Sequence, residues 1–212
     1  MDNYKLMNNG VIHQNKLFNK LCEYNSEYSN KYNNYGIKGE LISHLRLGFL
    51  LGSINKIPNS ILDVGYGNGD FLKVASKCIK KCYGTDISDY ITPDKVENIS
   101  WENVLKTHFD VITFFDSLEH FPDINIIKDL KCDYIFITLP WCHHFDDDET
   151  WFLEWKHRRP DEHLWHFNEK SLINFFLENG YEKINSGIPF EDIIRIDNNY
   201  IPNILTAIFK KN

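Results

Sequence analysis

The sequence lacks the features of a membrane-spanning, secreted or disulfide-stapled chain. No apolar run approaches the roughly 20 residues that a membrane helix needs. Residues 1–20 are polar and contain no apolar core of a signal peptide. The five cysteines are odd in number, which excludes a complete intrachain disulfide framework. Reduced thiols are typical of the cytosol, so we expect a cytoplasmic protein.

An excess of basic charge is also absent. The 23 Lys and Arg residues stand against 30 Asp and Glu residues, a net charge of −7, and no long basic run occurs. Proteins that bind nucleic acid through its phosphates cluster their cations, so neither nucleic acid nor a membrane is the expected partner. The 212 residues are 42% hydrophobic and 25% charged, which favours one elaborated globular domain and excludes a disordered chain.

Residues 1–37 form a polar segment rich in Asn and Tyr that precedes the expected domain at 38–212. Within it, side chains recur at steps of three and four residues, the spacing of one helix face: Leu17, Leu21, Tyr24, Tyr28, Tyr32 and Tyr35. This pattern predicts an N-terminal helical cover. Its tyrosines either pack on the domain, the commoner arrangement for such a stripe, or face a ligand. A second helix is predicted at 39–54.

Strand-like and helix-like segments alternate between residues 60 and 141. Short runs rich in apolar, β-branched and aromatic residues predict strands at 60–65, 81–87, 109–115 and 132–139, with helices at 70–77 and 124–130. Repeated βα units imply an α/β fold, a doubly wound and mostly parallel sheet with helices on both faces. A helix at 168–179 and two strands at 181–196 and 204–209, with an antiparallel return, complete the chain.

A glycine-rich loop after the first of these strands is the strongest chemical signal. The segment Asp63-Val64-Gly65-Tyr66-Gly67-Asn68-Gly69 joins a strand to a helix, where glycines allow a tight turn close to a ligand. Asp86 ends the next strand, 21 residues after Gly65, where a carboxylate can accept hydrogen bonds from both ribose hydroxyls of a nucleoside. Asp70 stands where a dinucleotide fingerprint needs its third glycine, which opposes NAD.

The spacing Asp-x-Gly-x-Gly-x-Gly resembles motif I of the class I S-adenosylmethionine (SAM)-dependent methyltransferases. The block FDVITFFDSLEHFPD at 109–123 is similar to small-molecule members that carry a Leu-Glu-His motif after the fourth strand, and the similarity continues through 134–141 and 161–182. It implies a seven-stranded sheet with a reversed C-terminal strand. The implied activity is methyl transfer from SAM to a hydroxyl or amine of a small molecule such as a sugar, a nucleotide-sugar or a metabolite.

The resemblance also implies, position by position, which residues bind the cofactor. The loop would surround the methionine end of SAM, Asp86 would hold the ribose, and residues after the second and third strands would contact the adenine. Residues at the tip of the fourth strand would border the methyl group. The implied set is Asp63, Val64, Gly65, Tyr66, Gly67, Gly69, Asp86, Ile87, Trp101, Phe115, Asp116 and Ser117.

Histidines and acids form a second group of candidate residues. We predict Glu119, His120 and His163 as catalytic residues, with a histidine as general base because imidazole titrates near neutral pH. The alternative is a Mg²⁺ or Mn²⁺ site made by Asp116, Glu119, His120 and His163. That set is similar to a metal site of some ubiquinone-pathway O-methyltransferases and small-RNA 2′-O-methyltransferases, but it has Asp116 in place of a Glu.

Two other functions stay open. A metal-assisted RNA 2′-O-methyltransferase and a catalytically silent SAM-binding partner subunit would share the same cofactor loop. The Asp/Asn-Pro-Pro-aromatic motif of base N-methyltransferases is absent, because Asp116-Ser117-Leu118-Glu119 stands at its place. The sequence names neither the acceptor nor the oligomeric state. Four tryptophans either line an aromatic acceptor pocket or pack the fold: Trp141, Trp151, Trp155 and Trp165.

Overall fold

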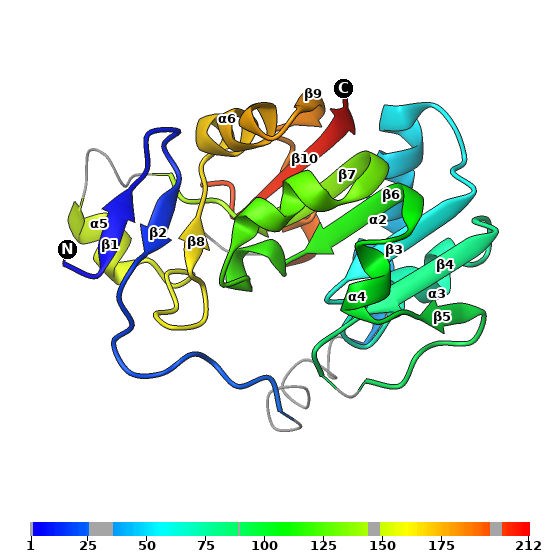
Figure 1. Ribbon diagram of the computed structural model, residues 1–212, viewed down its shortest axis with the longest axis horizontal. Coiled ribbons are helices and arrows are strands. Elements are labelled where there is room, and N and C mark those ends of the chain that lie inside the picture. The colour runs from blue at the N-terminus through cyan, green and yellow to red at the C-terminus, as the bar shows by residue number, and fades with distance from the viewer. Residues whose placement is uncertain (1, 26–35, 89, 144–148, 196–200) are drawn as a thin grey trace.

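A seven-stranded sheet forms the centre of the computed structural model, which describes residues 2–25, 36–88, 90–143, 149–195 and 201–212 (Figure 1). Its strands follow the order β5-β4-β3-β6-β7-β10-β9 and span Ser60–Val64 (β3), Lys81–Thr85 (β4), Val96–Asn98 (β5), His108–Phe115 (β6), Lys131–Pro140 (β7), Tyr181–Ser186 (β9) and Ile204–Lys211 (β10). Strands β3 to β7 pair in parallel, whereas β10 is antiparallel to both β7 and β9. The predicted mostly parallel sheet with a reversed C-terminal strand is confirmed.

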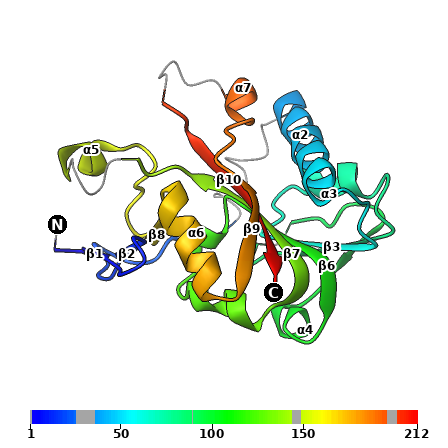
Figure 2. The same ribbon diagram turned by 90° about the horizontal axis from the view of Figure 1, so that it is seen from above.

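Helices cover both faces of the sheet, as Figure 2 shows. They are α2 (Ile37–Ile54) and α3 (Asp70–Ala75) on one face, and α4 (Trp101–Val104) and α6 (Glu169–Glu178) on the other. Successive strand side chains alternate between these layers: Ile61 and Val111 pack with α2 and α3, whereas Leu62 and Ile112 join the opposite core. Burial on both faces explains why these strands appear as continuous apolar runs. No helix among the described residues is both long and apolar enough to cross a membrane.

Local signals set the ends of α6 as the sequence predicts. The side chain of Asn168 accepts a hydrogen bond from the backbone N–H of Ser171, and Ser171 Oγ accepts one in return from the backbone N–H of Asn168. This reciprocal cap satisfies two backbone donors that the first helical turn leaves free. Gly180 follows the helix with a φ of +83°, a conformation that glycine adopts without steric cost.

The N-terminal segment forms a small separate sheet instead of the predicted helix. Strands β1 (Tyr4–Leu6) and β2 (Ile12–Gln14) pair with each other, and β2 pairs with β8 (Trp165–His166) (Figure 1). The predicted helical cover is wrong for residues 17–25, which are irregular, and the rest of the tyrosine stripe lies outside the described residues. Tertiary contacts replace the helix. The backbone N–H of Cys22, which in a helix would donate to the carbonyl of Phe18, donates instead to the backbone carbonyl of Asp161, and the N–H groups of Phe18 and Asn19 donate to its carboxylate.

The strand predicted at 181–196 is also too long. Strand β9 ends at Ser186, and Gly187 follows with a φ of +78°. The chain then turns into the short helix α7 (Asp192–Arg195), which returns toward α2. This turn matters for the site, because it carries Arg195 to the same edge of the sheet as the glycine-rich loop.

Candidate active site

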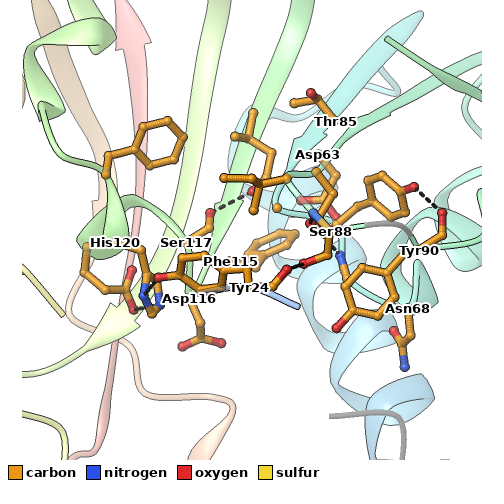
Figure 3. Close-up of a pocket in the computed structure, with 18 of the residues that line it drawn as sticks. Tyr24, Asp63, Asn68, Thr85, Ser88, Tyr90, Phe115, Asp116, Ser117 and His120 are labelled. Carbon is orange, nitrogen blue, oxygen red and sulfur yellow. Dashed lines mark hydrogen bonds and ion pairs between the residues drawn. The ribbon is translucent and has the colours of Figure 1, made fainter. Parts of the chain in front are cut away.

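A cavity of about 800 Å³ opens at the carboxyl ends of β3, β4 and β6. Open α/β sheets bind ligands at this edge, because the loops that follow parallel strands gather there. Figure 3 shows two groups of side chains in this cavity: Asp63, Thr85, Ser88 and Tyr90 lie on one side, and Asp116, Ser117 and His120 lie on the other. The cavity therefore joins the two sets of residues that the sequence singled out.

Gly65 makes the first turn of the glycine-rich loop against the tip of β6. Its φ is +77°, and a Cβ added there would lie 2.8 Å from the Cβ of Ser117. The hydroxyl of Ser117 donates a 2.7 Å hydrogen bond to the carbonyl of Val64, which holds the two strand tips together (Figure 3). A side chain at position 65 would break this contact, so the close approach requires glycine.

Asp86 fastens the loop to the tip of β4. Its Oδ2 accepts a 2.9 Å hydrogen bond from the backbone N–H of Gly67, and its Oδ1 accepts a 2.7 Å bond from the backbone N–H of Ser88. Each carboxylate oxygen keeps a lone pair, so the group can still accept hydrogen bonds from ligand hydroxyls. Gly69 does not line the cavity; it precedes α3 with a φ of +73°, and a Cβ there would collide with the ring of Pro93.

Asp63 is the penultimate residue of β3, directly before the loop, and is 2% exposed. Burial raises the pKa of its carboxyl to about 7, although Thr113 Oγ1 donates a 2.7 Å hydrogen bond that favours the ionised form. On the outer side of the cavity, Ile87 is 82% exposed and Trp101 packs against Phe121, so two apolar side chains border the opening. Such surfaces suit a flat heteroaromatic ring.

A network of two arginines and two acids closes the opposite wall. Asp116 Oδ2 lies 2.5 Å from Arg195 Nη2 and 3.3 Å from Arg46 Nη2. The fully buried Glu191 accepts hydrogen bonds from the Nε atoms of both arginines, at 2.6 Å from Arg46 and 2.8 Å from Arg195. Burial opposes ionisation of Asp116, but the charges of Arg195 and Arg46 hold its pKa below the usual range.

Glu119 and two histidines form a buried cluster beside this network. Glu119 and His120 lie on the short 3₁₀ helix η1 (Leu118–His120), directly after the tip of β6, and His163 comes from the segment before β8. The two imidazole rings are 4.6 Å apart between centroids. His120 and His163, which are far apart in the sequence, therefore lie side by side. Glu119 is 1% exposed; burial, and then the charge of Asp116, raise the pKa of its carboxyl well above the usual value.

Hydrogen bonds fix the orientation of both imidazoles. His120 Nδ1 lies 3.0 Å from the backbone carbonyl of Glu162 and 2.8 Å from Tyr24 Oη (Figure 3). His163 Nδ1 lies 2.8 Å from the backbone carbonyl of His157. Burial lowers the pKa of both histidines, which keeps the rings neutral at pH 7.

The structure places nearly all predicted site residues on the cavity wall. Among the described residues, Gly69 alone of the predicted cofactor and catalytic sets is not part of that wall. The tryptophans at 141, 151, 155 and 165 do not line it either, and Trp151 and Trp155 pack with Tyr4 and Phe152 instead. Sequence reasoning missed Arg46 and Arg195 because no motif surrounds them, and it named Tyr24 only as part of a stripe that packs on the domain or faces a ligand.

The comparisons with known proteins identify the family. Residues 38–186 match the family described as "Methyltransferase domain", which is more than half of the chain. The chain therefore belongs to this family and is a class I SAM-dependent methyltransferase. Comparison with curated protein sequences gave no match.

Solved structures share the fold at low sequence identity. Magnesium protoporphyrin IX methyltransferase from Synechocystis PCC 6803 with bound S-adenosylhomocysteine (SAH) is 12% identical, covers 89% of this chain and 96% of its own, and has a TM-score of 0.63. The YcgJ protein from Bacillus subtilis is 16% identical, covers 80% and 99%, and has a TM-score of 0.57. The [4+2]-cyclase SpnF is 12% identical, covers 81% and 80%, and has a TM-score of 0.56. Because a cyclase shares this fold, the fold alone does not define the reaction.

Proposed function

We propose that this protein transfers the methyl group of SAM to a hydroxyl or amine of a small molecule. One observation carries the proposal: a single cavity of about 800 Å³ joins the glycine-rich loop with Asp86 to the buried cluster of Glu119, His120 and His163. The first half suits a nucleoside cofactor, and the second half suits a group that must lose a proton. Methyl transfer to oxygen or nitrogen needs both halves side by side.

The residues around the loop fit SAM. The bare backbone at Gly65 and Gly67 leaves room for a ligand at the tip of β3, and Asp86 presents acceptor oxygens for ribose hydroxyls. SAM supplies an electrophilic methyl group on a positively charged sulfur. Asp63 lies on the same wall, and its ionised form favours a cationic ligand, whereas the charge of Asp116 is balanced by Arg46 and Arg195.

The cluster of Glu119, His120 and His163 takes up the proton that the methyl acceptor loses. As the lone pair of the acceptor forms a bond to the methyl carbon, the carbon–sulfur bond breaks and its electrons stay on sulfur, which leaves SAH. The acceptor loses its proton to Nε2 of His120 or His163. Burial lowers the pKa of both imidazoles, so the rings are neutral and each has a ring nitrogen with a lone pair that can receive the proton.

The N-terminal segment, residues 1–37, acts as a cover over this cavity. Among its described residues, Leu21, Cys22 and Tyr24 line the cavity wall, and Tyr24 contacts His120 through its hydroxyl. The backbone carbonyl of Tyr24 accepts a hydrogen bond from Ser88 Oγ on the cofactor side. Tyr24 therefore bridges the two halves of the cavity, which favours an enclosed small acceptor over a polymer.

Calorimetry and a turnover assay test the proposal. We expect the chain to bind SAM and SAH and not NAD. Formation of SAH with pooled small-molecule hydroxyl and amine acceptors, followed by mass detection of a product 14 Da heavier, tests the acceptor class. Binding of NAD without SAM would refute the cofactor assignment. Methylation confined to RNA, or SAM binding with no turnover on any acceptor, would refute the small-molecule assignment.

A further inference from the structure

The buried cluster of Glu119, His120 and His163 contains hydrogen-bond acceptors that face one another without a donor. Each residue offers one ligand atom, and these atoms all lie within 4.8 Å of one another. Neither carboxylate oxygen of Glu119 meets a hydrogen-bond donor from another described residue, although the side chain is 1% exposed. A buried carboxylate without a partner is costly, so such a group points to something that binds there.

The Nε2 atoms are the ligand atoms that the two histidines have left for this cluster, because each Nδ1 lies against a backbone carbonyl. A backbone carbonyl can only accept a hydrogen bond, so the Nδ1 atoms that lie against the carbonyls of Glu162 and His157 carry the protons. In the neutral rings each Nε2 then keeps a lone pair. Nδ1 bonded to a carbonyl, with Nε2 free, is the usual arrangement of a histidine that ligates a metal.

A proton on Glu119 does not satisfy this arrangement. The distance from Glu119 Oε1 to His120 Nε2 is 4.0 Å, which is too long for a hydrogen bond. A cation bound between them would pair with the carboxylate and both lone pairs at once. We propose that Glu119, His120 and His163 form a binding site for a divalent first-row transition metal.

The neighbouring acids are already engaged. Asp116, which the sequence analysis placed in the alternative metal set, is paired with Arg46 and Arg195 and is not among the three converging ligands. Glu162 Oε1 lies 2.8 Å from Arg159 Nη1. Two imidazoles and one carboxylate suit Mn²⁺, Fe²⁺, Co²⁺ or Zn²⁺ better than Mg²⁺, which prefers an all-oxygen shell.

The site narrows the acceptor class, and this step rests on the proposed function. Three protein ligands leave further coordination positions open, as in metal sites that bind substrate. The cluster lines the acceptor side of the cavity, so an acceptor could reach the ion there. Oxygen is the preferred ligand of Mn²⁺, so a hydroxyl is favoured over an amine as the methyl acceptor.

Manganese binding by the whole chain tests the site without any assay of turnover. After chelator treatment, we expect one Mn²⁺ per chain by calorimetry and electron paramagnetic resonance, and a rise in Tm with added Mn²⁺. Glu119→Gln keeps the shape of the side chain and should weaken Mn²⁺ binding at least tenfold and remove the rise in Tm, while SAH binding persists. His163→Ala should do the same.

A surface pair provides the matched control. Glu40 and His44 lie 3.8 Å apart on the exposed side of α2, so Glu40→Gln and His44→Ala should leave Mn²⁺ binding unchanged. Absence of Mn²⁺, Co²⁺ and Zn²⁺ binding to a chain that binds SAH would overturn the metal site and leave the proposed function intact. Equal Mn²⁺ affinity in Glu119→Gln and the parent would also overturn it. Failure to bind SAH would instead count against the cofactor assignment.

Discussion

Three acids at the tips of β3 and β6 have different electrostatic surroundings. Asp63 is buried with one hydroxyl donor, Asp116 is held between two guanidinium groups, and Glu119 is buried with no donor from another described residue. The pKa is accordingly raised at Asp63, lowered at Asp116 and raised most clearly at Glu119. Shifted pKa values of this kind cluster where a protein binds or converts a ligand.

The pKa of Asp63 predicts a pH dependence of stability. The carboxyl has a pKa of 3.8 in an unfolded chain and of about 7 in the folded protein, so between these pH values the folded state keeps a proton that the unfolded state has released. Its contribution is fully present below pH 3.8 and is lost as the pH rises through about 7. Asp63→Asn cannot titrate, so its free energy of unfolding should rise relative to the parent from pH 4 to pH 8, by a few kcal/mol at about 1.4 kcal/mol per pKa unit.

Urea denaturation of both proteins across this range measures the difference directly. Comparison with the parent removes the opposite trend of buried histidines such as His157, whose pKa of about 4 makes stability fall as the pH decreases below 6.5. A difference between Asp63→Asn and the parent that stays constant from pH 4 to pH 8 would show that Asp63 titrates normally.

Asp86 should carry a measurable part of the cofactor affinity. Its two oxygens hold the backbone of Gly67 and Ser88, and they are the acceptors expected for the ribose hydroxyls. Asp86→Ala removes both functions and should weaken SAH binding by about 1–3 kcal/mol, the cost of leaving buried donors without a charged acceptor. Calorimetry gives the value. Asp94→Ala, an exposed acid eight positions later, is the control and should bind as the parent does.

At the scale of elements, the sequence predicted the sheet well because strands buried on both faces leave an unmistakable apolar run. Helix α2 was predicted from its apolar periodicity, and α6 from its periodicity and its Asn168 cap; both kinds of signal are local. The helix predicted over residues 17–25 is wrong because a long-range contact, not a local signal, determines the structure there. A stripe of Leu and Tyr fits a helix, but the segment is held by Asp161, far away in the sequence, and no local pattern reveals that contact.

The residues of the site also fall into two groups: those that local sequence predicts and those that only tertiary packing brings together. The glycine-rich loop, Asp86 and Glu119-His120 follow directly from strand ends, so their position in the sequence predicts their place in the cavity. Arg46 and Arg195 reach the cavity only because α2 and α7 pack beside each other over the sheet edge. An isolated arginine in a helix is usually a solvated residue, and only the three-dimensional arrangement shows that these two hold Asp116.

Glycines in α2 offer a test of helix stability. Gly48 and Gly52 are exposed within the helix, and an added Cβ would meet no atom within 4 Å. Gly48→Ala and Gly52→Ala should each stabilise the protein by about 0.5–1 kcal/mol, because alanine loses less backbone entropy in a helix. Gly180 also has open space but a φ of +83°, so Gly180→Ala should destabilise the protein. Thermal unfolding of the three variants separates the two cases, and equal shifts would contradict the argument.

At the scale of the whole molecule, the N-terminal segment is fastened to the domain at three separate points. Strand β2 pairs with β8, the carboxylate of Asp161 holds residues 14–19, and Tyr24 contacts both Ser88 and His120. Few apolar contacts support the stretch between these points, because Leu17, Phe18 and Leu21 are 43%, 50% and 44% exposed. The segment should therefore open locally at a lower free energy than the sheet.

Limited proteolysis tests how this segment is held. Asp161 accepts hydrogen bonds from Gln14 Nε2 at 2.6 Å, from the backbone N–H of Phe18 at 2.9 Å and from that of Asn19 at 2.8 Å. Asp161→Asn keeps the shape, and asparagine tolerates the φ of +66°, but the substitution removes the charge and turns a donor toward one of these donors. Trypsin should then cut after Lys16 and Lys20 at least several-fold faster than in the parent or in the surface control Asp94→Asn.

Bound cofactor should protect the N-terminal segment from trypsin, whereas Asp161→Asn exposes it. If residues 1–37 cover the cavity, ligand and segment stabilise each other, because Tyr24 lies between the cofactor side and His120. Saturating SAH should slow the cleavage after Lys16 and Lys20 in the parent, and less so in Asp161→Asn, where the segment is released more often. Cleavage rates in the parent that are the same with and without SAH would mean that the segment is a static part of the wall, and that enclosure of the acceptor does not depend on its closing.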